Sequence, residues 1–118
     1  MVEFSVKFSG GSVRLIKVCM DLFGSSFENA SLRNSDFSGS TLAGVSFNNV
    51  DLRGVDFGET ILTGAVFHGC DLRGASFVGS FVNEVQFIDC DLNNCDFGAA
   101  RVIKTHFVGC DFGKNPLL

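Results

Sequence analysis

Hydrophobic positions recur every five residues along most of this chain. Each fifth residue from Leu22 to Leu117 is apolar, and the residue two places before it is small in nearly every case. In an α-helix five residues advance about 500°, so such a column would spread around the helix. In a flat strand an odd period places successive members on opposite faces. The pattern therefore predicts a chain that turns a corner every five residues and directs both columns into one interior.

The residues at the predicted corners support this arrangement. The position two after each large apolar residue is mostly Gly or Asn, which tolerate the positive φ of tight turns. Four sides would close one coil in about 20 residues, giving about five coils and a height of about 24 Å. Phe stands at every tenth position from Phe27 to Phe107, with Leu or Val between. Phe should therefore fill two opposite walls of an all-β structure.

Several segments follow a known five-residue consensus, A(D/N)LXX. The best matches are residues 50–54 (VDLRG), 70–74 (CDLRG) and 90–94 (CDLNN). On these motifs the chain resembles the pentapeptide-repeat family, and the resemblance covers residues 20–117. It implies a right-handed, quadrilateral parallel β-helix. It implies no single function, because one fold hosts many functions.

Both ends of the chain depart from the five-residue frame. We expect residues 1–19 to form a short β-type N-terminal cap and residues 20–118 to form the β-helix, because solenoids need covered ends. One form of the cap is a hairpin before Gly10 and Gly11, built on the alternating Val2, Phe4, Val6 and Phe8. The other is a degenerate coil that keeps the spacing, shifted by one, through Phe8, Val13, Val18 and Phe23. The C-terminal segment predicts no capping helix, so pairing of two copies through this end is a further hypothesis.

Composition and charge narrow the function classes. The chain has 118 residues, 14 of them Phe, with no Trp or Tyr and a net charge of −4. One domain is expected, and an acidic excess after residue 20 disfavours nucleic-acid binding, which needs clustered Lys and Arg. No apolar run approaches ~18 residues, and the first eleven residues lack the apolar stretch of a signal peptide. We therefore expect a soluble, cytoplasmic protein.

Carboxylates recur at twenty-residue spacing and should lie above one another on two neighbouring walls. This candidate acidic stripe consists of Asp51, Asp71, Asp91 and Asp111 on one wall and Asp36, Asp56 and Asp96 on the next. The residues either cap turn amides or imitate DNA phosphates, as in the quinolone-resistance branch of the family, which protects DNA gyrase. Arg33, Arg53 and Arg73 lie on the first of these walls and should partly neutralise it. Stacked single carboxylates do not converge on one ion, so no metal site is expected.

Cysteine and histidine residues offer little catalytic chemistry. Cys70, Cys90 and Cys110 are each 20 residues apart, so they should stack in the inward-facing small column as packing thiols. The odd cysteine count and the expected compartment favour reduced thiols. His68 and His106 should lie on the surface, and no nucleophile–base pair accompanies them. We therefore predict no enzymatic activity and no cofactor.

Outward-facing apolar residues in the second half of the chain form a candidate protein-contact patch. Its members are Ile61, Phe81 and Ile103 on one wall and Val66, Ile88 and Val108 on the following wall. The alternatives are scattered surface residues, or a bulge that turns Phe81 inward in place of Val82. The sequence favours a rigid, non-enzymatic interaction module that binds a protein partner of unknown identity, or a second copy as a homodimer. The alternative function is a DNA mimic that binds gyrase.

Overall fold

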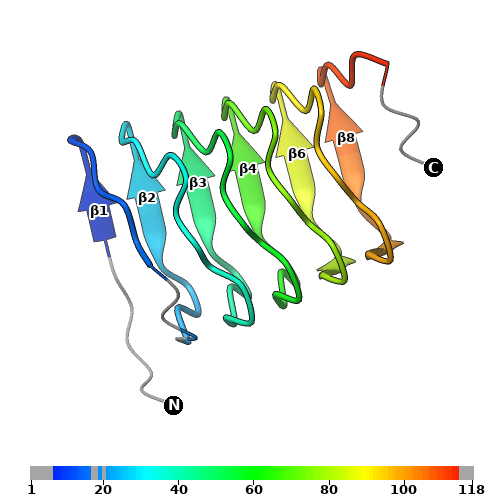
Figure 1. The fold of residues 1–118 in the computed structure, drawn as a ribbon, viewed down its shortest axis with the longest axis horizontal. Helices are drawn as coiled ribbons and strands as arrows, with labels where there is room; N and C mark the ends of the chain where they lie inside the picture. Colours follow the sequence, from blue (N-terminus) through cyan, green and yellow to red (C-terminus); the bar gives the residue numbers. More distant parts are fainter. Residues whose placement is uncertain (1–6, 17–18, 20, 115–118) are drawn as a thin grey trace.

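The computed structural model describes residues 7–16, 19 and 21–114. Short parallel strands on successive coils stack into a solenoid (Figure 1). One sheet has the order β1-β2-β3-β4-β6-β8, and a second sheet pairs β5 with β7. The strands are β1 (Lys7–Ser9), β2 (Ser26–Glu28), β3 (Ser46–Asn48), β4 (Val66–His68), β5 (Phe81–Asn83), β6 (Gln86–Ile88), β7 (Arg101–Ile103) and β8 (His106–Val108). The predicted all-β solenoid of about five coils is confirmed.

The stacking register makes each coil four walls of five residues. Phe27 pairs with Phe47, and Phe47 with Phe67, so equivalent residues recur one coil apart. We number the walls in chain order by the core residue of the first regular coil: Leu22, Phe27, Leu32 and Phe37 mark the first to fourth walls. The six-stranded sheet is the second wall, and β5 and β7 belong to the first wall. The molecule measures 36 Å along its longest axis.

Phenylalanine rings of the second and fourth walls fill the interior. Phe47 and Phe67 stack with ring centroids 5.0 Å apart, and Phe57 meets Phe47 edge-on at 6.0 Å. Both contact types are favourable geometries for aromatic pairs. From Phe37 to Phe87 these rings are completely buried, as are the Leu residues of the other walls between them. The prediction that Phe fills two opposite walls is confirmed.

Corners between walls adopt the left-handed backbone conformation at every fifth residue from Gly24 to Gly109. Gly64 (φ 74°) and Asn34 (φ 61°) suit this conformation, because Gly has no Cβ and Asn tolerates it. Glu84 and Ala99 also adopt it, with φ of 55° and 57°. The frame therefore imposes the corner even where the residue type does not favour it.

Each coil contains two kinds of side. In a turn-type side, the amide three residues after the core residue donates to the core carbonyl, as from Val55 to Leu52 at 3.2 Å. The second wall is strand-type throughout, and the first wall changes from turn-type to strand-type at β5. At that point Leu62 is followed by Val82 and Val102 as core residues. β-branched side chains favour extended backbone, which accounts for the change.

The N-terminal cap pairs in parallel with the first regular coil. Phe8 lies opposite Phe27, an offset one residue shorter than in the regular coils. Phe8, Val13 and Leu15 pack against the core. Phe23 is 59% exposed and does not belong to the interior. Val2, Phe4 and Val6 of the hairpin form, and Val18 of the coil form, lie outside the described residues.

The last described coil is less covered than the middle coils. Phe97, Val102, Phe107 and Phe112 contact the core but are only partly buried. Residues 115–118, which follow this coil, lie outside the described residues. The hypothesis of pairing through this end therefore stays a prediction.

Candidate interaction surfaces

Aspartate and arginine residues alternate along the third wall. Arg33 contacts Asp51 at 3.1 Å, and Arg53 contacts Asp51 at 2.7 Å and Asp71 at 3.6 Å. Arg73 repeats the arrangement with Asp71 at 2.6 Å and with the next coil's Asp91 at 3.7 Å. Each guanidinium of Arg53 and Arg73 thus bridges two coils. Three of the seven carboxylates of the predicted acidic stripe, Asp51, Asp71 and Asp91, therefore belong to a ladder of ion pairs rather than to a run of negative charge.

Every carboxylate of the candidate stripe also caps a backbone amide. Asp51 accepts from the Arg53 amide at 3.2 Å and Asp56 from the Gly58 amide at 2.7 Å, each through Oδ1. The same contact to the amide two residues on is made by Asp36, Asp71, Asp91, Asp96 and Asp111. The hydrogen bond from Arg73 lowers the pKa of Asp71. This geometry agrees with the interpretation that the Asp residues of the stripe cap turn amides.

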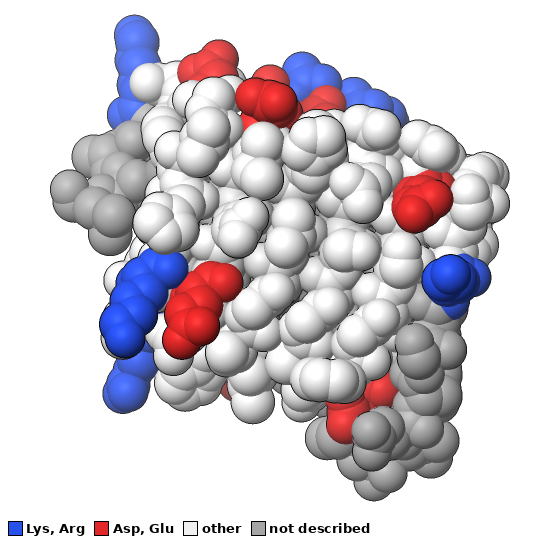
Figure 2. All heavy atoms as spheres, turned by 180° about the vertical axis from the view of Figure 1, so that it is seen from behind, with Lys and Arg blue, Asp and Glu red and all other residues white. Residues whose placement is uncertain are grey.

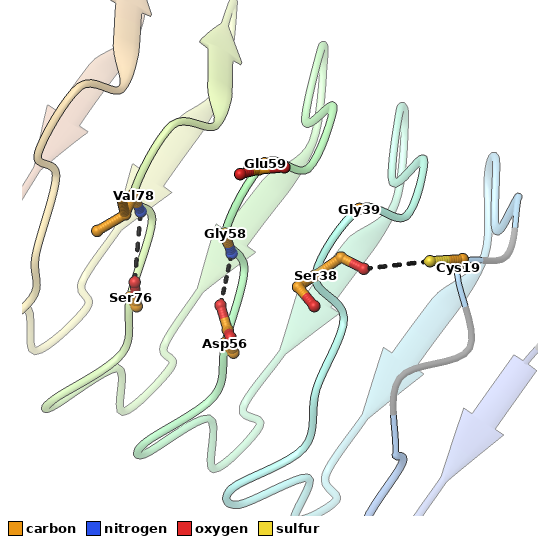
Figure 3. Close-up of a pocket in the computed structure, with 8 residues that line it drawn as sticks. All are labelled: Cys19, Ser38, Gly39, Asp56, Gly58, Glu59, Ser76 and Val78. Carbon is orange, nitrogen blue, oxygen red and sulfur yellow. Dashed lines mark hydrogen bonds between the residues drawn. The ribbon is translucent and has the colours of Figure 1, made fainter.

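The fourth wall carries a shallow hollow of ≈ 470 Å³ (Figure 3). The Asp56 carboxylate accepts from Gly58, the Ser76 hydroxyl accepts from the Val78 amide at 3.4 Å, and the Cys19 thiol points to a backbone carbonyl. Three of the polar side chains that line the hollow, those of Cys19, Asp56 and Ser76, are thus engaged with neighbouring backbone. Within the described residues no group of His, Cys, Asp or Glu could hold a metal ion.

The second wall presents a largely uncharged face (Figure 2). The outward residues of its strands, β1, β2, β3, β4, β6 and β8, include two charged side chains, Lys7 and Glu28. The remaining positions are Ser, Asn, Val, His, Gln and Ile. Val108 is 57% exposed, and Ile88 and Val66 are half-buried in the same face. The predicted histidine positions are also here, His68 and His106 both being exposed.

The first wall carries the remaining apolar residues. Ile61 and Phe81 are 41% and 40% exposed and lie opposite one another in adjacent coils. Ile103 is on the same wall but in the neighbouring row, opposite Asn83. Val82 is completely buried, so the alternative of a bulge that turns Phe81 inward is wrong. Sequence reasoning missed exposed Phe23 as a member of this surface, because its apolar character suggested a cap position.

Buried thiols have a structural role. Cys70, Cys90 and Cys110 form the thiol column, and each sulfur lies 3.2–3.3 Å from the carbonyl oxygen of a core Phe one coil earlier. All described cysteines are free thiols. Burial raises the pKa of Cys95 to about 12, and the hydrogen bond with Cys70, together with burial, raises the pKa of Cys90. Cys90 and Cys95 therefore stay protonated and unreactive at neutral pH.

Stacked five-residue sides, left-handed corners and a Phe- and Leu-filled interior define a β-solenoid of the pentapeptide type. A family model, pentapeptide repeats in eight copies, matches residues 21–58 and 51–87. The chain belongs to the pentapeptide-repeat family. No curated protein sequence matches it.

Solved structures agree with this assignment. A pentapeptide repeat protein from the Arabidopsis thaliana thylakoid lumen is 31% identical, with a TM-score of 0.80 over 86% of this chain and 71% of that one. Rfr23 from the cyanobacterium Cyanothece is 16% identical, with a TM-score of 0.82 over 92% and 88% of the two chains. The fluoroquinolone resistance protein QnrB1 is 23% identical, with a TM-score of 0.65 over 90% and 61%. The last two likenesses concern the fold alone.

These comparisons correct one expectation. The cytoplasmic location predicted from the N-terminal pattern is contradicted, because the 31% identical structure is of a thylakoid lumen protein. The prediction rested on the first eleven residues, which lack the apolar stretch of one kind of targeting signal. That absence does not identify the compartment in which a protein is found. No helix of the described residues is long and apolar enough to cross a membrane.

Proposed function

We propose that this chain is a rigid, non-enzymatic module that binds a protein partner through the largely uncharged second wall. The observation that carries the proposal is the apolar pair of half-buried Ile88 and 57% exposed Val108, which lie opposite one another on a face with few charged groups. Protein interfaces are depleted of charge at their centre and exclude water around apolar anchors. A stacked solenoid wall is also preorganised, so little conformational entropy is lost when it binds.

The geometry of the stripe favours this function over DNA mimicry. A phosphate-like surface needs uncompensated negative charge at regular spacing, whereas three Asp residues of the third wall pair with Arg33, Arg53 and Arg73. Each carboxylate is further committed to a turn amide. We expect no effect of micromolar protein on gyrase supercoiling with or without a quinolone. Protection of gyrase in that assay would support mimicry instead.

A pair of matched valine substitutions tests the binding surface. Val108→Lys places a cation in the proposed interface, and Val78→Lys makes the same change on the fourth wall, where Val78 is 40% exposed. Both variants should keep the circular dichroism spectrum of the wild type. Quantitative affinity capture from the source organism should then retain a partner with the wild type and Val78→Lys and lose it with Val108→Lys. Equal capture by all three proteins would contradict the proposal.

A further inference from the structure

We infer that the first wall binds a second copy of this chain, with the two solenoid axes antiparallel. This inference goes beyond the partner binding proposed for the second wall, and it concerns a different surface. It rests on the order in which side chains are stacked along two outward rows of the first wall. The inner row consists of Asp21, Thr41, Ile61, Phe81 and Arg101. The outer row consists of Phe23, Ala43, Thr63, Asn83 and Ile103.

Two identical walls can face each other across a two-fold axis that lies in the interface plane. If that axis is perpendicular to the solenoid axis, each row faces the same row of its partner in reverse order. The middle residue then meets itself, so Ile61 contacts Ile61 of the second copy. If the axis is instead parallel to the solenoid axis, the two rows exchange places. Asp21 would then face the apolar Phe23, which disfavours that arrangement.

The reversed inner row is complementary in charge and size. Its acidic end, Asp21, faces its basic end, Arg101, and this ion pair forms twice. Between the ends, the large Phe81 faces the smaller Thr41, also twice. Antiparallel pairing therefore brings opposite charges together at both edges and apolar residues at the centre, as isologous interfaces require.

The outer row shows the same correspondence. Phe23 and Ile103 stand at opposite ends and are 59% and 51% exposed, and reversal places them against each other. Thr63 at the centre meets itself, and Ala43 meets Asn83. Both rows thus have a self-complementary order. The outer row has two exposed apolar contacts at its edges, and the inner row has one apolar contact, Ile61 with itself, between two contacts of Phe81 with Thr41.

The two charged ends are available for this contact. Within the described chain neither Asp21 nor Arg101 makes an ion pair. The Arg101 guanidinium lies over the Phe81 ring at 5.5 Å, which holds it at the wall. Asp21 uses one oxygen to cap the Phe23 amide at 3.0 Å, and its second oxygen can accept from a guanidinium of the partner copy.

A charge-reversal cycle tests this geometry. In analytical ultracentrifugation at up to about 100 μM, a range that detects Kd values near micromolar, the wild type should sediment as a dimer. Asp21→Arg and Arg101→Asp should each weaken dimerisation at least about tenfold, because like charges then face each other. The double variant should restore it to within about threefold, as expected of a direct pair.

A substitution at the two-fold axis provides the second arm. Ile61→Asp introduces two facing carboxylates but suits the turn-type side, where Asp caps the amide at equivalent positions. It should abolish the dimer while the thermal unfolding temperature of the monomer stays within a few degrees. A wild type that is monomeric over the whole concentration range would overturn the inference. So would a dimer that survives Ile61→Asp, or one that the double charge reversal does not restore, since that dimer would use another face such as the last coil.

Discussion

The left-handed corners make a prediction in which one chemical change has opposite effects at two positions. Ala99 occupies a corner with φ 57°, whereas Ala43 lies one residue before the corner at Gly44 and is not in the left-handed region. Replacing Ala99 with Gly should stabilise the protein. The same replacement at Ala43 should destabilise it.

The size of each effect follows from backbone energetics. An L-residue in the left-handed region costs about 1–2 kcal/mol, and glycine removes that cost. Glycine also raises the entropy of the unfolded chain, which lowers stability by about 0.4–1 kcal/mol. The free energy of unfolding of Ala99→Gly should therefore rise by about 0.5–1 kcal/mol in total. Ala43→Gly has no strain to relieve and should lose about 0.5–1 kcal/mol.

Circular dichroism is the suitable assay, because the chain has no Trp or Tyr for fluorescence. Thermal unfolding should show Ala99→Gly melting about 2–5 °C above the wild type, with Ala43→Gly below it. Glu84→Gly, at a corner with φ 55°, should follow Ala99→Gly. A loss of stability at both corners would refute the reasoning, because it would mean that the solenoid frame does not hold these residues in a strained conformation.

Three further predictions concern the core, the ion-pair ladder and the thiols. Phe57→Ala, which removes a ring stacked at 5.6 and 5.0 Å between two others, should cost about 3–5 kcal/mol in urea denaturation. Val78→Ala, at a 40% exposed residue of the fourth wall, should cost under about 0.5 kcal/mol. Arg73→Gln should raise the pKa of Asp71 measured by NMR titration. Because the wild-type pKa is lowered, the stabilisation is present above the usual Asp range and lost as pH falls through the folded pKa, so the two proteins should converge in stability at acidic pH. Exposed Cys19 should react with a thiol reagent in the folded protein, and peptide mass spectrometry should show the two buried thiols of the column reacting at the unfolding rate.

Much of the fold could be predicted because residues of the same type recur at a fixed spacing along the sequence. The five-residue spacing excludes helix and flat strand, and the Gly and Asn positions predict the left-handed corners that the structure has at Gly64 and Asn34. The alternation of Phe with Leu predicts the stacked rings of the second and fourth walls. These features depend on local sequence alone, because each residue meets its own equivalent in the next coil.

Features that depend on relative register could not be predicted. The one-residue slip between β1 and β2 depends on how the cap meets the first coil, and shifted spacing therefore placed Phe23 inside when it lies outside. The choice between capped turns and a free acidic stripe depended on where the Arg33, Arg53 and Arg73 side chains extend. Spacing places these residues on the correct wall but does not show which carboxylate each one reaches.

The distribution of surface charge follows from the two kinds of side. In a turn-type side the amide after the core residue can be capped by the side chain that precedes the core residue, as Asp56 caps Gly58. In a strand-type side the residue after the core residue lies within the strand, and its amide donates a hydrogen bond to the neighbouring strand. An Asp there has no amide to cap, and the strand-type positions hold Ser46, Val66 and Phe81 instead. Backbone type thus decides where carboxylates are stabilising, and it leaves the second wall and part of the first wall with few charged residues. The surfaces that we propose for binding are therefore a consequence of how each side satisfies its own amides.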